Sequence, residues 1–248
     1  MFNKKLRVLV TRPAHQANQL GRLIEQQGGQ AILLPTIAIE FIEADLTKLL
    51  QQDMAIFISP NAVQATQRLM QKQGIVWPKQ IMIAAVGAST AQALSAAGLP
   101  ATVVPEQFNS EGLLALPALQ NIGGKRIIIF RGDGGRELLS TILQQRSAVL
   151  TEVVIYRRTL PVMDIKQQLS GWQTGGLDII VVTSNTGLQN LLTIIGEAAR
   201  NWLLNMPLLV ISERMAQFAR ELGFVKKPLV ADNATDAAIV QALLKYTS

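Results

Sequence analysis

Short apolar runs of strand length alternate with helical patterns along the whole chain, and this alternation constrains the fold more than any other feature. Ten such runs lie near residues 8–10, 31–34, 55–58, 81–86, 102–104, 127–130, 150–156, 179–183, 208–211 and 229–230. Helical patterns separate most of them, for example at 59–71, 89–97, 135–145 and 185–195. Strands and helices in this alternation form βαβ units and hence parallel sheets. Ten strands are natural for two sheets of about five.

The sequence also repeats itself, which supports two sheets. Shifted by 125 residues, segment 56–64 falls on 181–189, so that Ser59 meets Ser184. Shifted by 119 residues, Arg12 meets Arg131 within matching strand and turn patterns. The duplication therefore runs through the whole chain.

The repeat alone leaves the domain boundary open. A tandem division would cut the chain near Gly123-Gly124. The alternative keeps residues of about 40–157 as one domain and builds the other from both ends of the chain. In either division, each of the two domains contains one complete copy of every repeated piece.

Composition and charge limit the classes of function. The 248 residues are 49% apolar, and the longest apolar runs have strand length, so we expect no membrane-spanning segment. The absence of cysteine excludes disulfides and thiolate chemistry. The first residues show no apolar signal segment, so we expect a cytoplasmic protein. The net charge of +6 is scattered, which favours a small anionic ligand over nucleic acid.

The turns that follow the strands are rich in small and hydroxyl-bearing residues. Ligands of parallel sheets bind beyond the carboxyl ends of the strands, where these turns lie. Serines at helix starts, such as Ser59 and Ser184, cap the helix, and neighbouring backbone N–H groups stay available to an anion. Such serines can equally act as caps with no ligand.

Known cofactor motifs fail when they are tested residue by residue. Glu137 occupies the third glycine position of a G-x-G-x-x-G motif that starts at Gly132, and Leu119 occupies the first glycine position of a Walker A motif. The single histidine, His15, has no partner of a catalytic triad or metal site nearby in the sequence. We therefore predict no cofactor and no metal.

At these turns the sequence resembles the uroporphyrinogen-III synthase family along nearly its whole length. The matching pieces are Ile58-Ser59-Pro60-Asn61-Ala62-Val63, Ala85-Val86-Gly87 with Thr90-Ala91, Arg131-Gly132-x-x-Gly135-Arg136-Glu137, Val154-Ile155-Tyr156-Arg157-Arg158, Thr183-Ser184 with Gly187-Leu188, and Ile211-Ser212 with Ala216. Each piece is short, and the ordered set is what carries the resemblance. Two positions depart from the family pattern: Ile58 and Met215 stand where threonine occurs in members of the family.

The resemblance implies an α/β fold of two flavodoxin-like domains with parallel sheets, joined by a two-stranded linker. The first domain would be discontinuous, with residues 1–36 and 160–248, and the second would comprise residues 37–159. The linker strands would lie at 36–40 and 154–159. The resemblance thus selects the discontinuous division over the tandem one.

The resemblance also implies a lyase that acts on a linear tetrapyrrole in haem biosynthesis. Hydroxymethylbilane would lose water and close into uroporphyrinogen III with inversion of its last pyrrole ring. The enzyme would be a monomer without a nucleic-acid or membrane partner. Tyr156 is our first candidate for a catalytic side chain and Thr90 the second. We expect the substrate carboxylates to be bound by Arg12, Ser59, Asn61, Gly87, Arg131, Gly132, Ser184, Thr186, Gly187 and Ser212.

Two other classes of function fit parts of the sequence. A non-catalytic, two-lobed protein that binds a small anionic ligand would also have paired α/β domains and few catalytic groups. A phosphate-ester or nucleotide enzyme could use the loop from Arg131 to Arg136, although the failed motifs argue against it.

Overall fold

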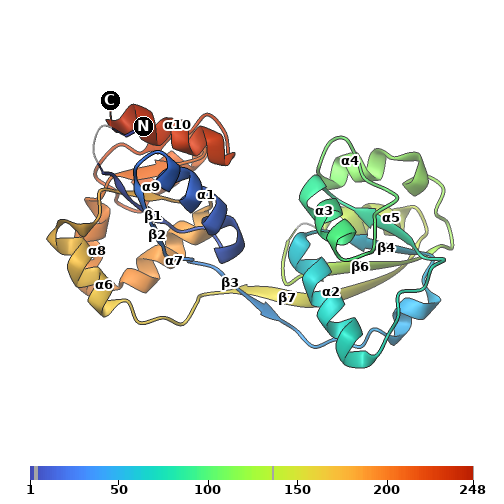
Figure 1. Ribbon diagram of the computed structural model, residues 1–248. Helices are drawn as coiled ribbons and strands as arrows, with labels where there is room; N and C mark the ends of the chain where they lie inside the picture. Colours follow the sequence, from blue (N-terminus) through green and yellow to red (C-terminus); the bar gives the residue numbers. More distant parts are fainter. Residues whose placement is uncertain (3–4, 136, 248) are drawn as a thin grey trace. The chain divides into compact units, whose positions relative to one another are not determined.

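The computed structural model divides the chain into two compact units, each built around its own sheet (Figure 1). It describes residues 1–2, 5–135 and 137–247. Unit 1 comprises Met1–Ala38 and Thr159–Ser248, and unit 2 comprises Ile39–Arg158. These bounds differ by two residues or fewer from the domain limits expected from the resemblance.

Unit 1 is formed by both ends of the chain. Its elements are β1 (Arg7–Val10), α1 (Ala14–Gln26), β2 (Gln30–Leu33), α6 (Lys166–Gly171), η3 (Trp172–Gly176), β8 (Ile179–Val181), α7 (Asn185–Ile195), α8 (Glu197–Leu204), β9 (Leu208–Val210), α9 (Glu213–Glu221), β10 (Leu229–Val230) and α10 (Asp236–Thr247). The strands pair in parallel in the order β10-β9-β8-β1-β2.

Unit 2 is formed by the middle of the chain. Its elements are β3 (Ala38–Phe41), η1 (Thr47–Gln51), β4 (Met54–Phe57), α2 (Pro60–Gln73), β5 (Met82–Ala85), α3 (Ala88–Ala96), α4 (Ser110–Ala115), η2 (Pro117–Leu119), β6 (Arg126–Gly132), α5 (Leu138–Gln145) and β7 (Val149–Thr159). The sheet order is β3-β7-β6-β4-β5, and the pairs from β7 to β5 are parallel.

The two sheets share one spatial plan once the repeat is taken into account. The repeat makes β6 equivalent to β1, β7 to β2 and β4 to β8. Read from β2, the first sheet runs β2-β1-β8-β9, and the second runs β7-β6-β4-β5 in the equivalent order. The duplicated sequence therefore gives the same parallel arrangement twice, from pieces that follow one another in a different order along the chain.

Each sheet is covered by helices on both faces, which explains its continuous apolar strands. In unit 1, Leu9 faces a core with α7, α8 and α9, whereas Val8 and Val10 face a second core with α1 and α10. Unit 2 repeats the alternation: Phe57 packs with α2 and α3, and Ile56 packs with α4 and α5. Successive side chains of a strand point to opposite faces, so the central strands of each sheet contribute to two cores.

Two sequence expectations are wrong in detail. The expected strand at 102–104 is reduced to one isolated bridge between Ala84 and Val103. The helix expected from residue 135 begins only at Leu138. Gly134 and Gly135 have φ values of 71° and 110°, a left-handed conformation that a helix cannot contain.

Candidate functional site

The predicted site residues lie at or near the carboxyl ends of parallel strands, four strands in unit 2 and three in unit 1. Unit 2 holds Ser59 and Asn61 after β4, Gly87 and Thr90 after β5, Arg131 and Gly132 at the end of β6, and Tyr156 within β7. Unit 1 holds Arg12 after β1, Ser184, Thr186 and Gly187 after β8, and Ser212 after β9. Each set therefore lies along one edge of its own sheet, as the parallel pairing requires.

The start of α2 places Ser59 at the centre of a small hydrogen-bond chain. Ser59 is the N-cap residue in an extended conformation, and Pro60 occupies the first helical position, as favoured at helix starts. The backbone N–H of Ala62 donates to Ser59 Oγ over 3.2 Å. Ser59 Oγ in turn donates to the phenol oxygen of Tyr156 over 2.9 Å. The cap of α2 is thereby linked to strand β7.

Tyr156 is buried beside Gly132 and leaves only 2% of its surface exposed. A Cβ atom on Gly132 would lie 2.5 Å from Tyr156 Cζ and 2.9 Å from its phenol oxygen, so only glycine fits beneath the ring. The ladder between β6 and β7 is irregular between Arg131 and Gly132, and the carbonyl of Tyr156 accepts from Asp133 N over 2.8 Å. This bulge and the glycine together admit the tyrosine to the edge of the sheet.

Arg131 pairs with Glu152, a carboxylate that sequence reasoning did not single out. Its guanidinium also donates to the carbonyl of Gly134 over 3.0 Å and so holds the glycine turn after β6. Burial raises the pKa of the Glu152 carboxyl, but hydrogen bonds from Ser140 and Arg131 outweigh burial and bring that pKa below its ordinary value. Arg131 is therefore already balanced by a negative charge of the protein.

The turn after β5 contributes two residues of the predicted site. Gly87 is the N-cap of α3, and its carbonyl accepts from the N–H of Thr90 over 3.1 Å. Thr90 is 2% exposed, whereas Gly87 and Asn61 are half-buried. The two catalytic candidates, Tyr156 and Thr90, are thus both buried side chains at the carboxyl edge of the second sheet.

The start of α7 in unit 1 resembles the start of α2. Ser184 accepts from the N–H of Gly187 over 3.0 Å. A Cβ on Gly187 would lie 2.9 Å from Ser184 Oγ and 3.2 Å from Thr36 Oγ1, so Thr36 packs against this helix start. Thr36 is fully buried, and its hydroxyl donates to the carbonyl of Thr11. The neighbour of the Ser184 cap is thus a threonine from the segment after β2, whereas the Ser59 cap contacts Tyr156 of β7.

Arg12, which we expected to bind a substrate carboxylate, is buried and paired. It is 8% exposed, forms an ion pair with Asp236 at the start of α10, and donates to the carbonyl of Ala234 over 2.8 Å. Its Nε is buried without a partner among the described residues. Both predicted arginines therefore contact a protein carboxylate first, and their role toward a substrate stays a prediction.

The remaining predicted residues lie at helix starts of unit 1. Ser212 caps α9 by accepting from the N–H of Met215 over 3.3 Å. Thr186 is exposed in the first turn of α7. Because the first N–H groups of a helix have no intrahelical acceptor, these turns present donors to an anion.

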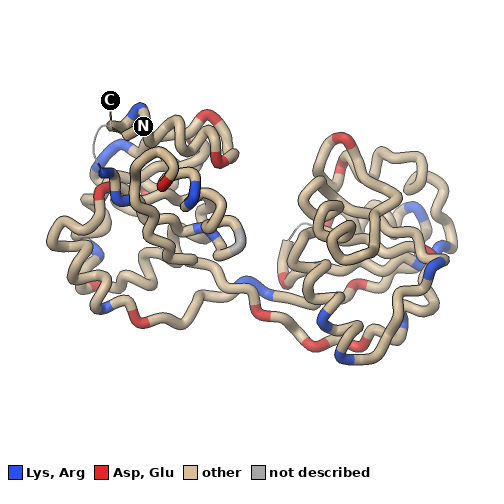
Figure 2. The backbone as a smooth tube through the Cα atoms, in the orientation of Figure 1, with Lys and Arg blue, Asp and Glu red and all other residues tan. Residues whose placement is uncertain are grey.

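The charged side chains of the described residues are spread over both units (Figure 2). Figure 2 shows Lys and Arg dispersed along both units and interspersed with Asp and Glu. Among residues 1–2, 5–135 and 137–247, no three His, Asp or Glu side chains come together as metal ligands, and no helix is both long and apolar enough to cross a bilayer. The side chain of His15 and the whole of Arg136 lie outside the described residues.

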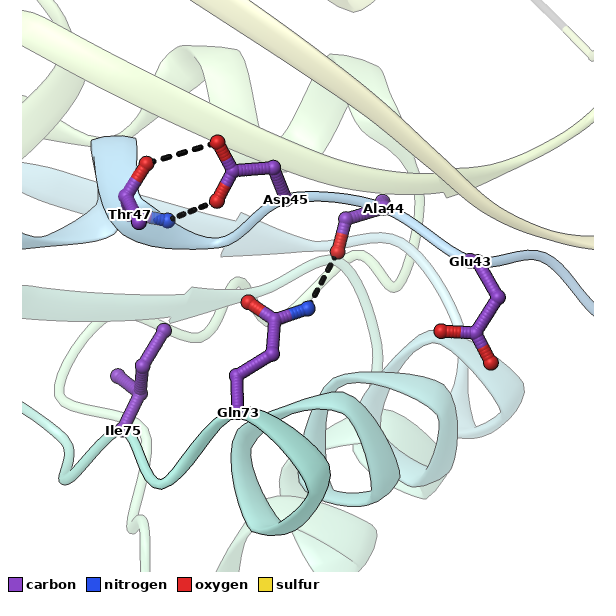
Figure 3. A pocket seen from close by; sticks show the side chains of 6 residues that line it. All are labelled: Glu43, Ala44, Asp45, Thr47, Gln73 and Ile75. Carbon is purple, nitrogen blue, oxygen red and sulfur yellow. Dashed lines mark hydrogen bonds between the residues drawn. The ribbon is translucent and has the colours of Figure 1, made fainter.

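An open hollow of unit 2 is lined by the segment between β3 and β4 and by residues at the end of α2 (Figure 3). It has a volume of about 590 Å³, and Glu43 and Asp45 are among its lining residues. Thr47 donates to Asp45 through its backbone N–H and its hydroxyl, which lowers the pKa of that carboxyl, and Gln73 donates to the carbonyl of Ala44. Glu43 is paired with Lys72, and none of the lining residues is a cation, so this hollow offers no charge that favours an anionic ligand.

Comparisons with known proteins agree on one family. The family model described as "Uroporphyrinogen-III synthase HemD" matches residues 18–241. The chain is 37% identical over 246 residues to a uroporphyrinogen-III synthase of Salmonella typhimurium, which covers 95% of this chain and 99% of that protein. It is 36% identical over 244 residues to one of Escherichia coli, with the same coverage.

A solved structure adds a likeness of fold. The uroporphyrinogen-III synthetase of Helicobacter pylori superposes with a TM-score of 0.64 over 98% of this chain and 100% of that chain, at 16% sequence identity. At this level of identity the superposition speaks for the fold alone, and it supports an α/β architecture with parallel sheets.

Proposed function

The chain belongs to the uroporphyrinogen-III synthase family, and from this premise we propose that it closes hydroxymethylbilane into uroporphyrinogen III. The observation that carries the proposal is the near full-length match to synthases at 36–37% identity. The same match favours an enzyme over a non-catalytic ligand-binding protein.

The proposed reaction requires more conformational control than chemistry. The bilane is electron-rich, and without an enzyme it loses water and closes to the uninverted isomer. The enzyme must hold the chain so that the inverted closure through a spiro intermediate is faster, which is an effect of orientation. Because a C–O bond breaks with loss of water and a ring closes, the enzyme would be a lyase.

Tyr156 is the residue that we propose as proton donor. Its phenol would give its proton to the hydroxyl oxygen of the bilane, and the C–O bond would break with its electron pair leaving on oxygen as water. The proton released when the rearranged pyrrole regains aromaticity would return to the phenolate. Phenols are protonated at neutral pH and can act in this way. The substrate hydroxyl has to reach the phenol oxygen, which lies against Ser59. Thr90 is the alternative donor.

The substrate carboxylates would be bound mainly by backbone N–H groups at helix starts. Support comes from the caps at Ser59, Ser184 and Ser212, which leave the remaining first-turn donors without intrahelical acceptors. Each helix start favours an anion by about 0.3–1 kcal/mol. Arg12 and Arg131 would add to this only by sharing their guanidinium groups between a substrate carboxylate and Asp236 or Glu152.

We further propose two flavodoxin-like domains with β3 and β7 as the linker strands. The order β2-β1-β8-β9-β10 corresponds to the 2-1-3-4-5 order of that fold, which supports the proposal. Ile42 N donates to the carbonyl of Ile155, and Glu40 contacts Arg157, so β3 runs antiparallel to β7. We also propose a monomer that acts in the cytoplasm without a cofactor.

Separation of product isomers tests the function. The enzyme is incubated with hydroxymethylbilane, and the oxidised products are resolved by chromatography. We expect the type III isomer to dominate, whereas a no-enzyme control gives type I. Type I alone in the presence of the folded protein would disprove the proposal.

A further inference from the structure

Ser59 is bonded on both sides, and the direction of its bonds is informative. An amide N–H can only donate, so Ala62 N–H must give its hydrogen to Ser59 Oγ. Ser59 Oγ also lies 2.9 Å from Tyr156 Oη, where its single hydrogen can be donated to the phenol oxygen. In this arrangement the phenol oxygen accepts from Ser59, and the hydrogen of the phenol stays available for another acceptor. Hydrogen bonds aligned in one direction strengthen one another.

Three further contacts fix the ring of Tyr156. Gly132 lies directly against it and leaves no room for a side chain. The guanidinium of Arg158 lies 6.0 Å from the ring centroid, within the range of a cation–π contact. The ring belongs to a buried apolar cluster that also contains Phe57 and Phe130. The ring plane is thus set by packing, and Ser59 is the partner that the structure gives to its oxygen.

We propose that Ser59 is a positioning residue for the reaction: its hydroxyl orients Tyr156 so that the phenol hydrogen points to the departing hydroxyl of the substrate. The inference rests on the proposed function, in which Tyr156 donates a proton. It assigns Ser59 a role beyond capping α2 and beyond contacting a carboxylate. The role belongs to one copy of the repeat, because the equivalent Ser184 packs with Thr36 and Gly187 and has no tyrosine partner among the described residues.

Four variants separate positioning from capping. Ser59→Ala removes the cap and the bond to Tyr156 together. Ser59→Asp keeps a strong cap but has no hydrogen to donate, so it would accept the phenol hydrogen instead. Ser59→Thr keeps both functions. Asp45→Ala is the matched control, because it removes a side chain that accepts from Thr47 in the segment between β3 and β4 of the same unit.

The measurements are kcat and KM on hydroxymethylbilane together with the midpoint of denaturant unfolding. We expect Ser59→Ala and Ser59→Asp to lower kcat about 10- to 100-fold, as misorientation of a reacting group does. Ser59→Asp should keep an unfolding midpoint near that of the wild type, and Ser59→Thr should keep kcat within about threefold. Asp45→Ala should lower the midpoint and leave kcat unchanged.

A double-mutant cycle decides whether Ser59 acts through Tyr156. In the Tyr156→Phe background the phenol oxygen is absent, so Ser59→Ala should lower kcat less than about twofold further. If the loss of kcat in the double variant equals the product of the two single losses, the proposal is overturned. A kcat of Ser59→Asp equal to that of the wild type would overturn it as well. If Tyr156→Phe itself keeps full kcat, the proton-donor role fails and the positioning role fails with it. If Tyr156→Phe is slow and Ser59→Ala is not, only the positioning role fails.

Discussion

The helices α2 and α7 begin with equivalent serines, and the comparison of their surroundings shows what the duplication has preserved. Ser59 and Ser184 both adopt an extended conformation and both accept from the N–H three residues later. Ser59 also bonds to the phenol of Tyr156, whereas Ser184 lies beside the buried hydroxyl of Thr36. Capping is a local property and survives in both copies. The tyrosine contact belongs to the copy in unit 2, so we expect unit 2 to contribute more to catalysis than unit 1.

The largest expected difference between the two units is in independent folding. Unit 2 is contiguous, and unit 1 needs both ends of the chain. We expect a fragment of residues 38–158 to show cooperative unfolding by circular dichroism and dispersed NMR signals. A fragment of residues 1–122 should remain unfolded, because it lacks β6 and β7 from the second sheet. The opposite result would favour the tandem division.

Tyr156 and Thr36 provide the next test of the comparison. Tyr156→Phe removes one oxygen and should lower kcat by about 10²–10⁴-fold, the usual contribution of a general acid. Thr36→Val removes the buried hydroxyl that lies beside the start of α7 in unit 1, and it should leave kcat within about threefold. The product of Tyr156→Phe should remain type III, since the turns set the substrate conformation. Retention of more than about a third of the wild-type rate would make the tyrosine a structural anchor, and Thr90→Val would then test the second candidate.

The two arginine ion pairs also differ, in how deeply they are buried. Arg12 is 8% exposed and Asp236 17%, whereas Arg131 is 12% exposed and Glu152 33%. Removing one partner of a buried pair costs about 3–5 kcal/mol, because the other charge is left uncompensated. We expect Arg12→Met to approach this loss of unfolding free energy and Arg131→Met to cost less. Adding Asp236→Asn to Arg12→Met should recover part of the loss, and a larger cost for Arg131→Met would contradict the ranking.

The two caps should be nearly equal in stability and unequal in catalysis. Loss of a serine cap costs about 0.5–2 kcal/mol of unfolding free energy, and we expect Ser59→Ala and Ser184→Ala both to fall in this range. Only Ser59→Ala should lower kcat, while Ser184→Ala should act mainly on KM. Denaturant unfolding and steady-state kinetics on the same preparations measure both effects. Equal losses of kcat would remove the distinction between the two copies.

Local signals in the sequence predicted most of the elements and the family. The serine and proline at the start of α2 and the alternation of apolar runs predicted helices and parallel sheets, and the ordered motifs predicted the family, which the comparisons confirm. The strand at 102–104 was wrong, because three β-prone residues do not reveal whether a neighbouring strand pairs with them along their length. The start of α5 was misplaced, because a glycine can be either a helix cap or a left-handed turn residue.

Long-range pairing could not be predicted. Tyr156 reaches Ser59 across 97 positions, and Arg12 reaches Asp236 across 224. No local pattern indicates which carboxylate neutralises a given arginine, so both arginines were interpreted as free to bind substrate. The fully buried Thr36 was missed for the same reason, since its role depends on the helix start of α7. The predicted roles of all site residues toward substrate stay predictions.

The smallest expected effect is a change of stability on acidification. It tests the ion pair of unit 2, in which Arg131 contacts Glu152. The pKa of Glu152 lies below its ordinary value, because hydrogen bonds from Ser140 and Arg131 outweigh its burial. A carboxyl with a lowered folded-state pKa stabilises the protein fully above its ordinary pKa, about 4.5, and loses this contribution as the pH falls through the lower folded-state value. At neutral pH the wild type should therefore be more stable than Glu152→Gln, and the difference should shrink below about pH 4.5. Denaturant unfolding from pH 7 to pH 3 measures it, with Glu106→Gln as a control for the loss of an exposed charge. A difference that stays constant or grows on acidification would mean that the charge of Glu152 does not stabilise unit 2, and Arg131 would then be free to serve a substrate carboxylate.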